Sequence, residues 1–291
     1  MLNDQSPKAG GPSDLELKMA GFLPERQAGY FCLRIKMAGG SLQADKLTAI
    51  KEVAEAYGQG RIHLTSRQNV EVPHIARADV EKAKARLAAD GLEPCALGPR
   101  LRTLTACHGM ASCKNGLIDA QGLAAALTKA LSGRGILPHK FRIGLSGCSN
   151  NCMKAEENEL GLKGGLRPQY DGRDCVHCGA CVKVCPGQAV SLREETIEHN
   201  PALCLNCGKC LNKCPQKCWS GQTGVLLSAG GRMGNEQTLA SRLGPLIPLD
   251  KIVGVVGKCL DFYEQNGQKG ERFKATLSRV GQAELLACLG L

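Results

Sequence analysis

The sequence predicts an α+β protein in which a cysteine-rich segment interrupts a larger host domain. Three observations support this prediction. Short runs rich in β-branched residues alternate with longer runs that have apolar residues at helical spacing. Glycine follows several of the helical runs, as it commonly does where a helix ends. Eight of the 17 cysteines fall within residues 175–214, and runs typical of a strand and two helices resume after them.

The first predicted unit has the order β-α-β-β-α. Gly39-Gly40 stops its first strand, and Ser41 is a typical N-cap for the helix that follows. Gly58 and Gly91 lie just after the two helical runs, where glycine often ends a helix. The expected elements are a strand over 30–37, a helix over 41–57, strands over 61–65 and 69–74, and a helix over 78–89.

Further elements surround the remaining cysteines. A strand over 101–105 leads to one cysteine pair, a strand over 140–145 leads to another, and a helix over 120–131 lies between them. The final part of the chain again has alternating character. There we expect a strand over 225–228 and helices over 250–265 and 272–278.

The cysteine content favours metal binding in a reducing cytoplasm. The count is odd in a chain of 291 residues, and twelve cysteines stand at metal-ligand spacing, so a disulfide scaffold is disfavoured. The opening residues are polar and no apolar run approaches transmembrane length, so we expect no membrane span. The formal net charge is +10, but lysine and arginine are dispersed. This disfavours a nucleic-acid partner and favours an anionic ligand or an acidic redox partner.

Two copies of the spacing C-x2-C-x2-C-x3-C-P make up the cysteine-rich segment. This spacing is typical of bacterial two-cluster ferredoxins, in which three close cysteines hold one 4Fe–4S cluster and the fourth ligates the neighbouring cluster. A structural zinc site is the alternative, and the repeated Cys-Pro endings favour clusters. The eight predicted ligands are Cys175, Cys178, Cys181, Cys185, Cys204, Cys207, Cys210 and Cys214.

A second quartet is split between two distant pairs, Cys107-x5-Cys113 and Cys148-x3-Cys152. Its spacing alone is compatible with a zinc site, a single iron–sulfur cluster or buried core cysteines. The other five cysteines fit no ligand pattern, and small buried thiols need no function. These five are Cys32, Cys95, Cys218, Cys259 and Cys288.

The residues around the split quartet resemble the sirohaem-binding sulfite and nitrite reductase family. The resemblance lies in residues 103–113, which read TLTACHGMASC, and residues 140–152, which read KFRIGLSGCSNNC. Residues 34–40 (RIKMAGG) and 63–69 (HLTSRQN) look like the two basic motifs of the family's ferredoxin-like half-domain. Residues 270–273 (GERF) are similar to a segment of its C-terminal helices.

The resemblance implies one sirohaem and three 4Fe–4S clusters. In that family the four split cysteines hold one cluster, and the last of them, here Cys152, also bridges to the sirohaem iron. The implied catalytic residues, which would bind the anion and deliver protons, are Lys36, Arg102, Lys140 and Arg142. The implied cofactor-binding residues are Arg34, His63, Thr65, Ser66, Arg67, Gln68, Asn150 and Cys152.

The spacing of the basic residues supports the implied catalytic site, and a few positions differ from the family pattern. Lys140 and Arg142 are two residues apart, so on a strand their side chains share one face, and Arg34 and Lys36 repeat this spacing. Lys36 stands where several relatives have an arginine, and an ammonium cannot supply the bidentate guanidinium contact. Two loop positions beside the split quartet also depart from the family pattern. These are His108 and Ser149.

The implied activity is the six-electron reduction of sulfite to sulfide. Nitrite reduction to ammonia at the same site is the enzymatic alternative, and a non-catalytic iron–sulfur protein of electron transfer is another. A monooxygenase of the cobalamin pathway on the same fold is a third, which would not need a double ferredoxin. The chain has no dinucleotide-binding fingerprint or recognisable flavin module, so a ferredoxin, or a flavoprotein with iron–sulfur subunits, is the expected donor.

The resemblance also implies a domain division and an assembly. Relatives with two repeats in one chain pack them about a pseudo-two-fold axis, and this chain has one, so we expect a homo-oligomer built on a two-fold dimer. Within the family, the chain looks most like the catalytic C subunit of anaerobic sulfite reductase or a small dissimilatory-type sulfite reductase with an inserted two-cluster ferredoxin. The expected parts are a flexible leader (1–14), a ferredoxin-like half-domain (15–92), a sirohaem and 4Fe–4S-binding domain (93–163 and 222–291) and an inserted two-cluster ferredoxin (164–221).

Overall fold

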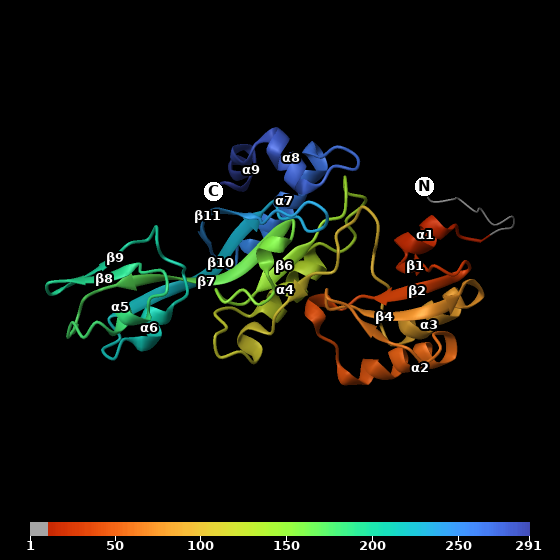
Figure 1. Cartoon of the computed structure of the whole chain (residues 1–291), viewed down its shortest axis with the longest axis horizontal. Helices are drawn as coiled ribbons and strands as arrows, with labels where there is room; N and C mark the ends of the chain where they lie inside the picture. Colours follow the sequence, from red (N-terminus) through yellow and green to blue (C-terminus); the bar gives the residue numbers. More distant parts are fainter. Residues whose placement is uncertain (1–10) are drawn as a thin grey trace.

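The computed structural model describes residues 11–291, which form three parts arranged in a row (Figure 1). A small α/β unit lies at one end, a five-stranded sheet with helices lies in the middle, and the cysteine-rich segment lies at the other end. Residues 1–10 of the expected leader lie outside the described residues. Its last residues lead into helix α1 (Asp14–Met19), which Ser13 caps through the backbone N–H of Glu16.

The N-terminal unit has the predicted β-α-β-β-α order, preceded by α1 and one further strand. Its sheet has the order β1-β2-β4-β3, and all neighbouring strands are antiparallel. Helices α2 and α3 pack on one face, where alternate residues of β2 such as Phe31 and Leu33 are buried. The elements are β1 (Phe22–Pro24), β2 (Tyr30–Ile35), α2 (Leu47–Tyr57), β3 (His63–Leu64), β4 (Val70–Ala76) and α3 (Val80–Ala89).

The predicted start of the first helix is wrong. Helix α2 begins at Leu47, and Ser41 caps no helix; its hydroxyl instead lies 2.8 Å from the Gln121 side-chain oxygen. Gly39 and Gly40 adopt positive φ, and a Cβ on Gly39 would lie 2.8 Å from Gln121. The segment before α2 is therefore shaped by packing against the central domain rather than by local capping.

The central domain is built on a mixed sheet with the order β11-β10-β7-β6-β5. Strands β5, β6 and β7 are parallel, whereas β7, β10 and β11 are antiparallel. The predicted strands over 101–105 and 140–145 are shorter than expected, because only one isolated bridge, Leu101 to Phe141, pairs their first halves. The elements are β5 (Thr105–Ala106), α4 (Ala120–Ala130), β6 (Ile143–Ser146), β7 (Leu160–Tyr170), β10 (Trp219–Ala229), β11 (Ser241–Ile247), α7 (Ile252–Asn266), α8 (Phe273–Val280) and α9 (Gln282–Leu289).

The two faces of this sheet have different partners. On one face, Leu160, Leu162, Val225 and Leu227 join residues of α4 and α7–α9 in one apolar core. Side chains at the intervening positions, including Lys163, instead line a cavity beside the loop that follows β6. The second face is therefore the one available to polar groups and cysteines.

The cysteine-rich segment projects from the central sheet on two long strands. Strand β7 pairs with β10 in one continuous register, from Leu160 opposite Ala229 to Tyr170 opposite Trp219. The expected domain boundaries at 163/164 and 221/222 thus fall inside continuous strands. Between them lie α5 (Ala180–Val184), the hairpin β8 (Val190–Arg193) and β9 (Thr196–His199), and α6 (Lys209–Lys213).

The sequence-based prediction did not include nine of these elements. They are strands β1, β7, β8, β9 and β11 and helices α1, α5, α6 and α9. Within residues 11–291, no helix combines the length and the apolar character that crossing a membrane requires.

Candidate functional site

A small cavity between the N-terminal unit and the central domain gathers basic side chains from distant segments. It has a volume of about 170 Å³, and we call it the basic cavity. Arg34 comes from β2 and Arg67 from the turn between β3 and β4, whereas Lys140 and Arg142 lie just before β6. The five cations that line it are Arg34, Arg67, Arg102, Lys140 and Arg142.

A larger cavity of about 430 Å³ shares Arg67 and Arg142 with the basic cavity. We call it the Cys152 cavity, because Cys152 of the split quartet is exposed and lines it. Ser66 also lines this space. A cysteine of the split quartet and two arginines therefore line one cavity, and the same two arginines also line the basic cavity.

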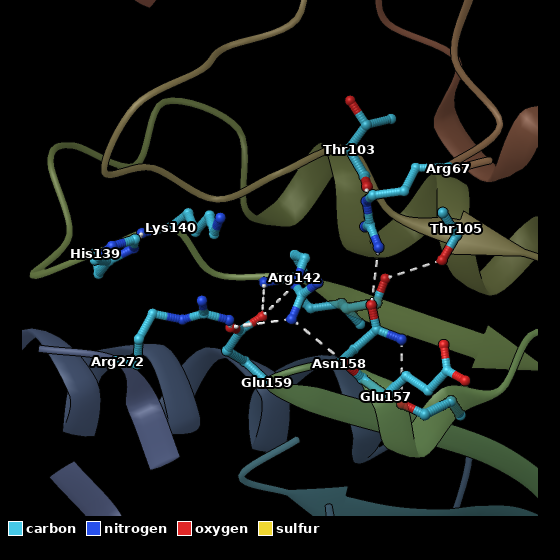
Figure 2. A network of polar contacts seen from close by, with 12 residues as sticks. Arg67, Thr103, Thr105, His139, Lys140, Arg142, Glu157, Asn158, Glu159 and Arg272 are labelled. Carbon is cyan, nitrogen blue, oxygen red and sulfur yellow. Dashed lines mark hydrogen bonds and ion pairs between the residues drawn. The ribbon is translucent and has the colours of Figure 1, made fainter. Parts of the chain in front are cut away.

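Arg67 ties the N-terminal unit to the central domain (Figure 2). Its guanidinium donates one hydrogen bond to the Asn158 side-chain oxygen at 2.9 Å and another to the Thr103 carbonyl at 3.2 Å. Burial, reinforced by the positive charge of Arg142, lowers the pKa of Arg67 to about 10. Arg67 remains a cation at neutral pH, and its two fixed contacts restrict its orientation.

A buried carboxylate, Glu159, lies between Arg272 and Arg142, and Arg142 lines the basic cavity (Figure 2). The Glu159 side chain is 1% exposed and accepts hydrogen bonds from the backbone N–H of Arg142 at 3.0 Å and from Arg142 Nε at 2.8 Å. Arg272, at the start of α8, makes an ion pair with the other carboxylate oxygen. The sequence-based assignment missed both Glu159 and Arg272. The signals available were an acidic residue directly before an apolar run and the arginine within the GERF segment.

Lys140 has no carboxylate partner within hydrogen-bonding distance among the described residues. Burial lowers the pKa of its ammonium group, and the nearby charges of Arg272, Arg142 and Arg102 lower it further. An amine in this setting holds its proton less tightly than an exposed lysine does. Lys140 therefore combines a positive charge with a proton that can be transferred.

Arg34 and Lys36 do not share a site, although their spacing predicts a common face. Arg34 donates from Nε to Glu71 on the adjacent strand at 2.7 Å, so its charge in the basic cavity is balanced. Strand β2 ends at Ile35, and Lys36 instead pairs with Glu93 at 3.3 Å. Lys36 lines a separate cavity of about 530 Å³, which Arg102 also reaches.

The remaining sequence-predicted cofactor residues divide between structural contacts and other surfaces. Gln68 donates to the Ala106 carbonyl and accepts from the Ala106 N–H, both at 2.9 Å. Thr65 accepts a hydrogen bond from the Asn69 N–H at 3.0 Å, and His63 is exposed on β3. Asn150 lines a fourth cavity, which is also lined by Cys204 and Cys207.

The four split cysteines converge around one loop pair. Burial raises the pKa of the Cys148 thiol, and the other thiols of the quartet raise it further, so all four lie within electrostatic reach. A Cβ on Gly147 would lie 2.6 Å from Gly109 Cα and 3.3 Å from Cys107 Sγ. The loops therefore approach too closely for a side chain, and the thiols have the donor chemistry that an iron–sulfur cluster requires.

The eight tandem cysteines divide into two groups, and each group combines cysteines from both sequence repeats. One small cavity is lined by the last cysteine of the first repeat and the first three cysteines of the second. In the other group, Cys214 lies close enough to Cys181 to raise its thiol pKa, after the larger effect of burial. The cavity cysteines are Cys185, Cys204, Cys207 and Cys210.

Neither type of quartet has the compact geometry of a site for one metal ion. Among residues 11–291, no three histidine, cysteine or acidic side chains come together closely enough to hold a single ion. A 4Fe–4S cluster separates its thiolate ligands by the width of the cluster.

Two family models together match almost all of the described chain. The model described as the nitrite/sulfite reductase ferredoxin-like half domain matches residues 23–90. The model described as the nitrite and sulphite reductase 4Fe-4S domain matches residues 97–291.

Known proteins show the same relationship. The chain is 33% identical over 270 residues to coenzyme F420-dependent sulfite reductase of Methanocaldococcus jannaschii, covering 91% of this chain and 43% of that protein. It is 32% identical over 178 residues to the C subunit of the anaerobic sulfite reductase of Salmonella typhimurium, covering 56% of this chain and 51% of that one. The chain thus spans about half the length of these relatives.

A solved structure shares the fold. The crystal structure of dissimilatory sulfite reductase I aligns with a TM-score of 0.73 at 20% identity, covering 90% of this chain and 69% of that one. The expected mixed fold with its ferredoxin-like half-domain is confirmed by this likeness and by the family models. The chain belongs to the nitrite and sulphite reductase family.

Proposed function

We propose that this chain reduces sulfite to sulfide, using one sirohaem and three 4Fe–4S clusters. The observation that carries the proposal is the basic cavity, where five cations surround a small space next to exposed Cys152. Sulfite is a small oxyanion, and charge-assisted hydrogen bonds are the strongest contacts that a protein can offer it. The similarity to the two sulfite reductases supports the same assignment.

The Cys152 cavity is the proposed place for sirohaem. Its lining combines the Cys152 thiol with Ser66, Arg67 and Arg142, which suit a carboxylate-rich macrocycle. When bound, sirohaem and its adjoining cluster supply the iron that holds sulfur and the electrons that reduce it. In this arrangement Arg67 and Arg142 face the cofactor on one side and the basic cavity on the other.

The cavity residues supply charge and protons. Arg142 and Arg102 are placed to stabilise the oxygen atoms of the anion, because preorganised cations act most strongly where negative charge develops. Lys140, whose pKa is lowered by burial and neighbouring cations, is the preferred proton donor to a departing oxygen. Lys36 is a less direct participant, since it faces the neighbouring cavity.

Electrons are proposed to enter through residues 164–221, acting as an inserted two-cluster ferredoxin. The group with Cys204 and Cys207 is the nearer of the two to the split quartet, since both share a cavity with Ser149 and Asn150. The first-repeat group with Cys214 is then the outer one and the entry point for the donor. A ferredoxin, or a flavoprotein with iron–sulfur subunits, is the proposed donor class.

A two-fold homodimer is the proposed minimum assembly. Strand β3 forms a short edge of the N-terminal sheet, with Ile62 and Leu64 48% and 75% exposed beside Arg67. Mixing an Arg67→Glu chain with a Cys152→Ser chain tests whether one protomer completes the site of its partner. Activity in the mixture that neither parent shows supports the dimer, whereas a fully active monomer by light scattering contradicts it.

Anaerobic purification with parallel assays tests the whole proposal. We expect about twelve cluster irons and one sirohaem iron per chain, from the twelve ligand cysteines. Sulfite should be turned over with higher kcat/KM than nitrite. A preference for nitrite would assign the alternative substrate, and a chain with clusters but no extractable sirohaem would be an electron-transfer protein. Zinc in place of iron would overturn the proposal.

A further inference from the structure

We propose that Glu159 is a positioning residue that, together with its second partner Arg272, fixes Arg142 at the wall of the basic cavity. The inference deepens the proposed function and rests on it for the identity of the bound anion. Glu159 itself lines neither the basic cavity nor the Cys152 cavity, so it acts through its arginine partners.

Backbone hydrogen bonding fixes the position of Glu159 independently of its side-chain contacts. It immediately precedes β7, and its carbonyl accepts a hydrogen bond from the Gly230 N–H at 2.9 Å, beside the end of β10. Its side chain is turned inward toward Arg142 and Arg272 (Figure 2). A carboxylate at this depth requires compensating charges and hydrogen bonds.

A contact between two buried aromatic rings positions Arg142 and Arg272 near Glu159. Phe141 and Phe273 are fully buried, and their ring centroids lie 5.1 Å apart. Each phenylalanine directly precedes or follows one of the arginines, so packing of the rings brings Arg142 and Arg272 to the same carboxylate. The ion-pair triad is therefore built on a rigid part of the core.

Glu159 determines which donors of Arg142 remain free. Glu159 accepts from both Nε and the backbone N–H of Arg142. One terminal nitrogen of Arg142 lies 3.5 Å from the Glu157 carbonyl and 3.5 Å from the second Glu159 oxygen. The outward part of the guanidinium is thus left for the cavity. Arg272 Nε is buried without a hydrogen-bond partner among the described residues, so the contact with Glu159 is its main constraint.

The carboxylate also balances the charge around Lys140. The charges that act on Lys140 are Arg272, Arg142 and Arg102, which disfavour its charged form, and Glu159, which favours it. The neighbouring His139 contacts Lys140 through the backbone, where its Nδ1 accepts the Lys140 N–H at 2.7 Å. Removing the negative charge of Glu159 would lower the pKa of Lys140 further. The basic limb of the pH profile would then move to lower pH.

The test compares Glu159→Gln, which keeps the shape but removes the charge, with Glu159→Asp, which keeps the charge but shortens the reach. Glu25→Gln is the matched control, because Glu25 is a largely buried carboxylate that pairs with His74 outside both cavities. Each holoprotein is assayed for sirohaem content, sulfite affinity by calorimetry in the oxidised state, kcat, KM and pH dependence.

Glu159→Gln should retain sirohaem but weaken sulfite binding and kcat/KM by about 10- to 100-fold, since small misplacements of catalytic groups have effects of this size. Its basic limb should shift to lower pH, Glu159→Asp should recover part of the loss, and Glu25→Gln should behave as wild type. Glu159→Gln added to Arg142→Gln should cost little beyond Arg142→Gln alone, because the loss in Glu159→Gln is carried mainly by that one guanidinium.

Unchanged affinity and pH profile in Glu159→Gln would overturn the inference, as would a loss confined to sirohaem content and thermal stability. Failure of the proposed function is a separate outcome. In that case the wild-type chain reduces neither sulfite nor nitrite, while calorimetric anion binding still reports whether Glu159 positions Arg142.

Discussion

Gln68 offers a direct test of how the N-terminal unit is joined to the cluster-binding loops. Its amide acts as a one-residue extension of the central sheet, pairing with both backbone groups of Ala106 at 2.9 Å. Ala106 is 1% exposed, and its other neighbour is strand β6. Gln68→Ala would therefore leave one buried N–H and one buried C=O without partners.

Each unpaired buried group costs about 1–3 kcal/mol, so the change should lower the free energy of unfolding by roughly 2–6 kcal/mol. Chemical denaturation followed by circular dichroism measures this, with Gln43→Ala as a control at an exposed glutamine. The loss should appear with or without sirohaem. A variant of wild-type stability that no longer retains sirohaem would refute this reasoning and would make Gln68 a cofactor ligand.

Three further outcomes are expected. Arg142→Gln should lower kcat/KM by an amount corresponding to about 2–4 kcal/mol of transition-state stabilisation while sirohaem stays bound, as a visible spectrum would show; unchanged kinetics with sulfite and nitrite alike would remove Arg142 from the site. Cys178→Ser or Cys207→Ser should reduce turnover with the donor protein but leave CO binding to chemically reduced sirohaem intact. Loss of CO binding in either variant would show that residues 164–221 are not a separate module. Hydrogen bonding from Arg279 lowers the pKa of Glu271 to about 2 from an ordinary 4.5, so its contribution to stability is present above pH 4.5 and lost as the pH falls toward 2; acid titration of wild type and Glu271→Gln should therefore converge at low pH.

The sequence predicted helices well where one buried face of the helix determines the spacing of its apolar residues. Helix α3 and helix α4 lie close to their predicted ranges because their apolar residues repeat at helical spacing and pack on one sheet each. Helix α2 begins six residues later than predicted, at Leu47 rather than Ser41, because the preceding segment packs against α4. Tertiary contacts of this kind leave no local signal.

The positive charge of the candidate site was predictable from the sequence, but the ion pairs that hold its side chains were not. Lys140 and Arg142 share the basic cavity, as their spacing suggested, but Lys36 lies beyond the end of its strand and faces another space. Glu159 could not be assigned, because its partner Arg272 is 113 residues away and only the fold brings them together. Basic motifs in a sequence indicate an anion site. The position of the carboxylate that orients the basic side chains depends on packing in the core and cannot be read from those motifs.

The two types of cysteine quartet show why some groupings of cysteines can be inferred from spacing and others cannot. In the tandem segment, each repeat contains Cys-Gly-x-Cys, and Gly179 and Gly208 have nearly equal positive φ values of 68° and 69° just before α5 and α6. The repeated sequence therefore builds the same local turn twice, and the packing of α5 against α6 brings the last cysteine of each repeat to its neighbour. The split quartet has no such repeat. Its pairs meet because parallel strands β5 and β6 deliver Cys107 and Cys148 to the same edge of the sheet, so that arrangement follows from topology rather than from spacing.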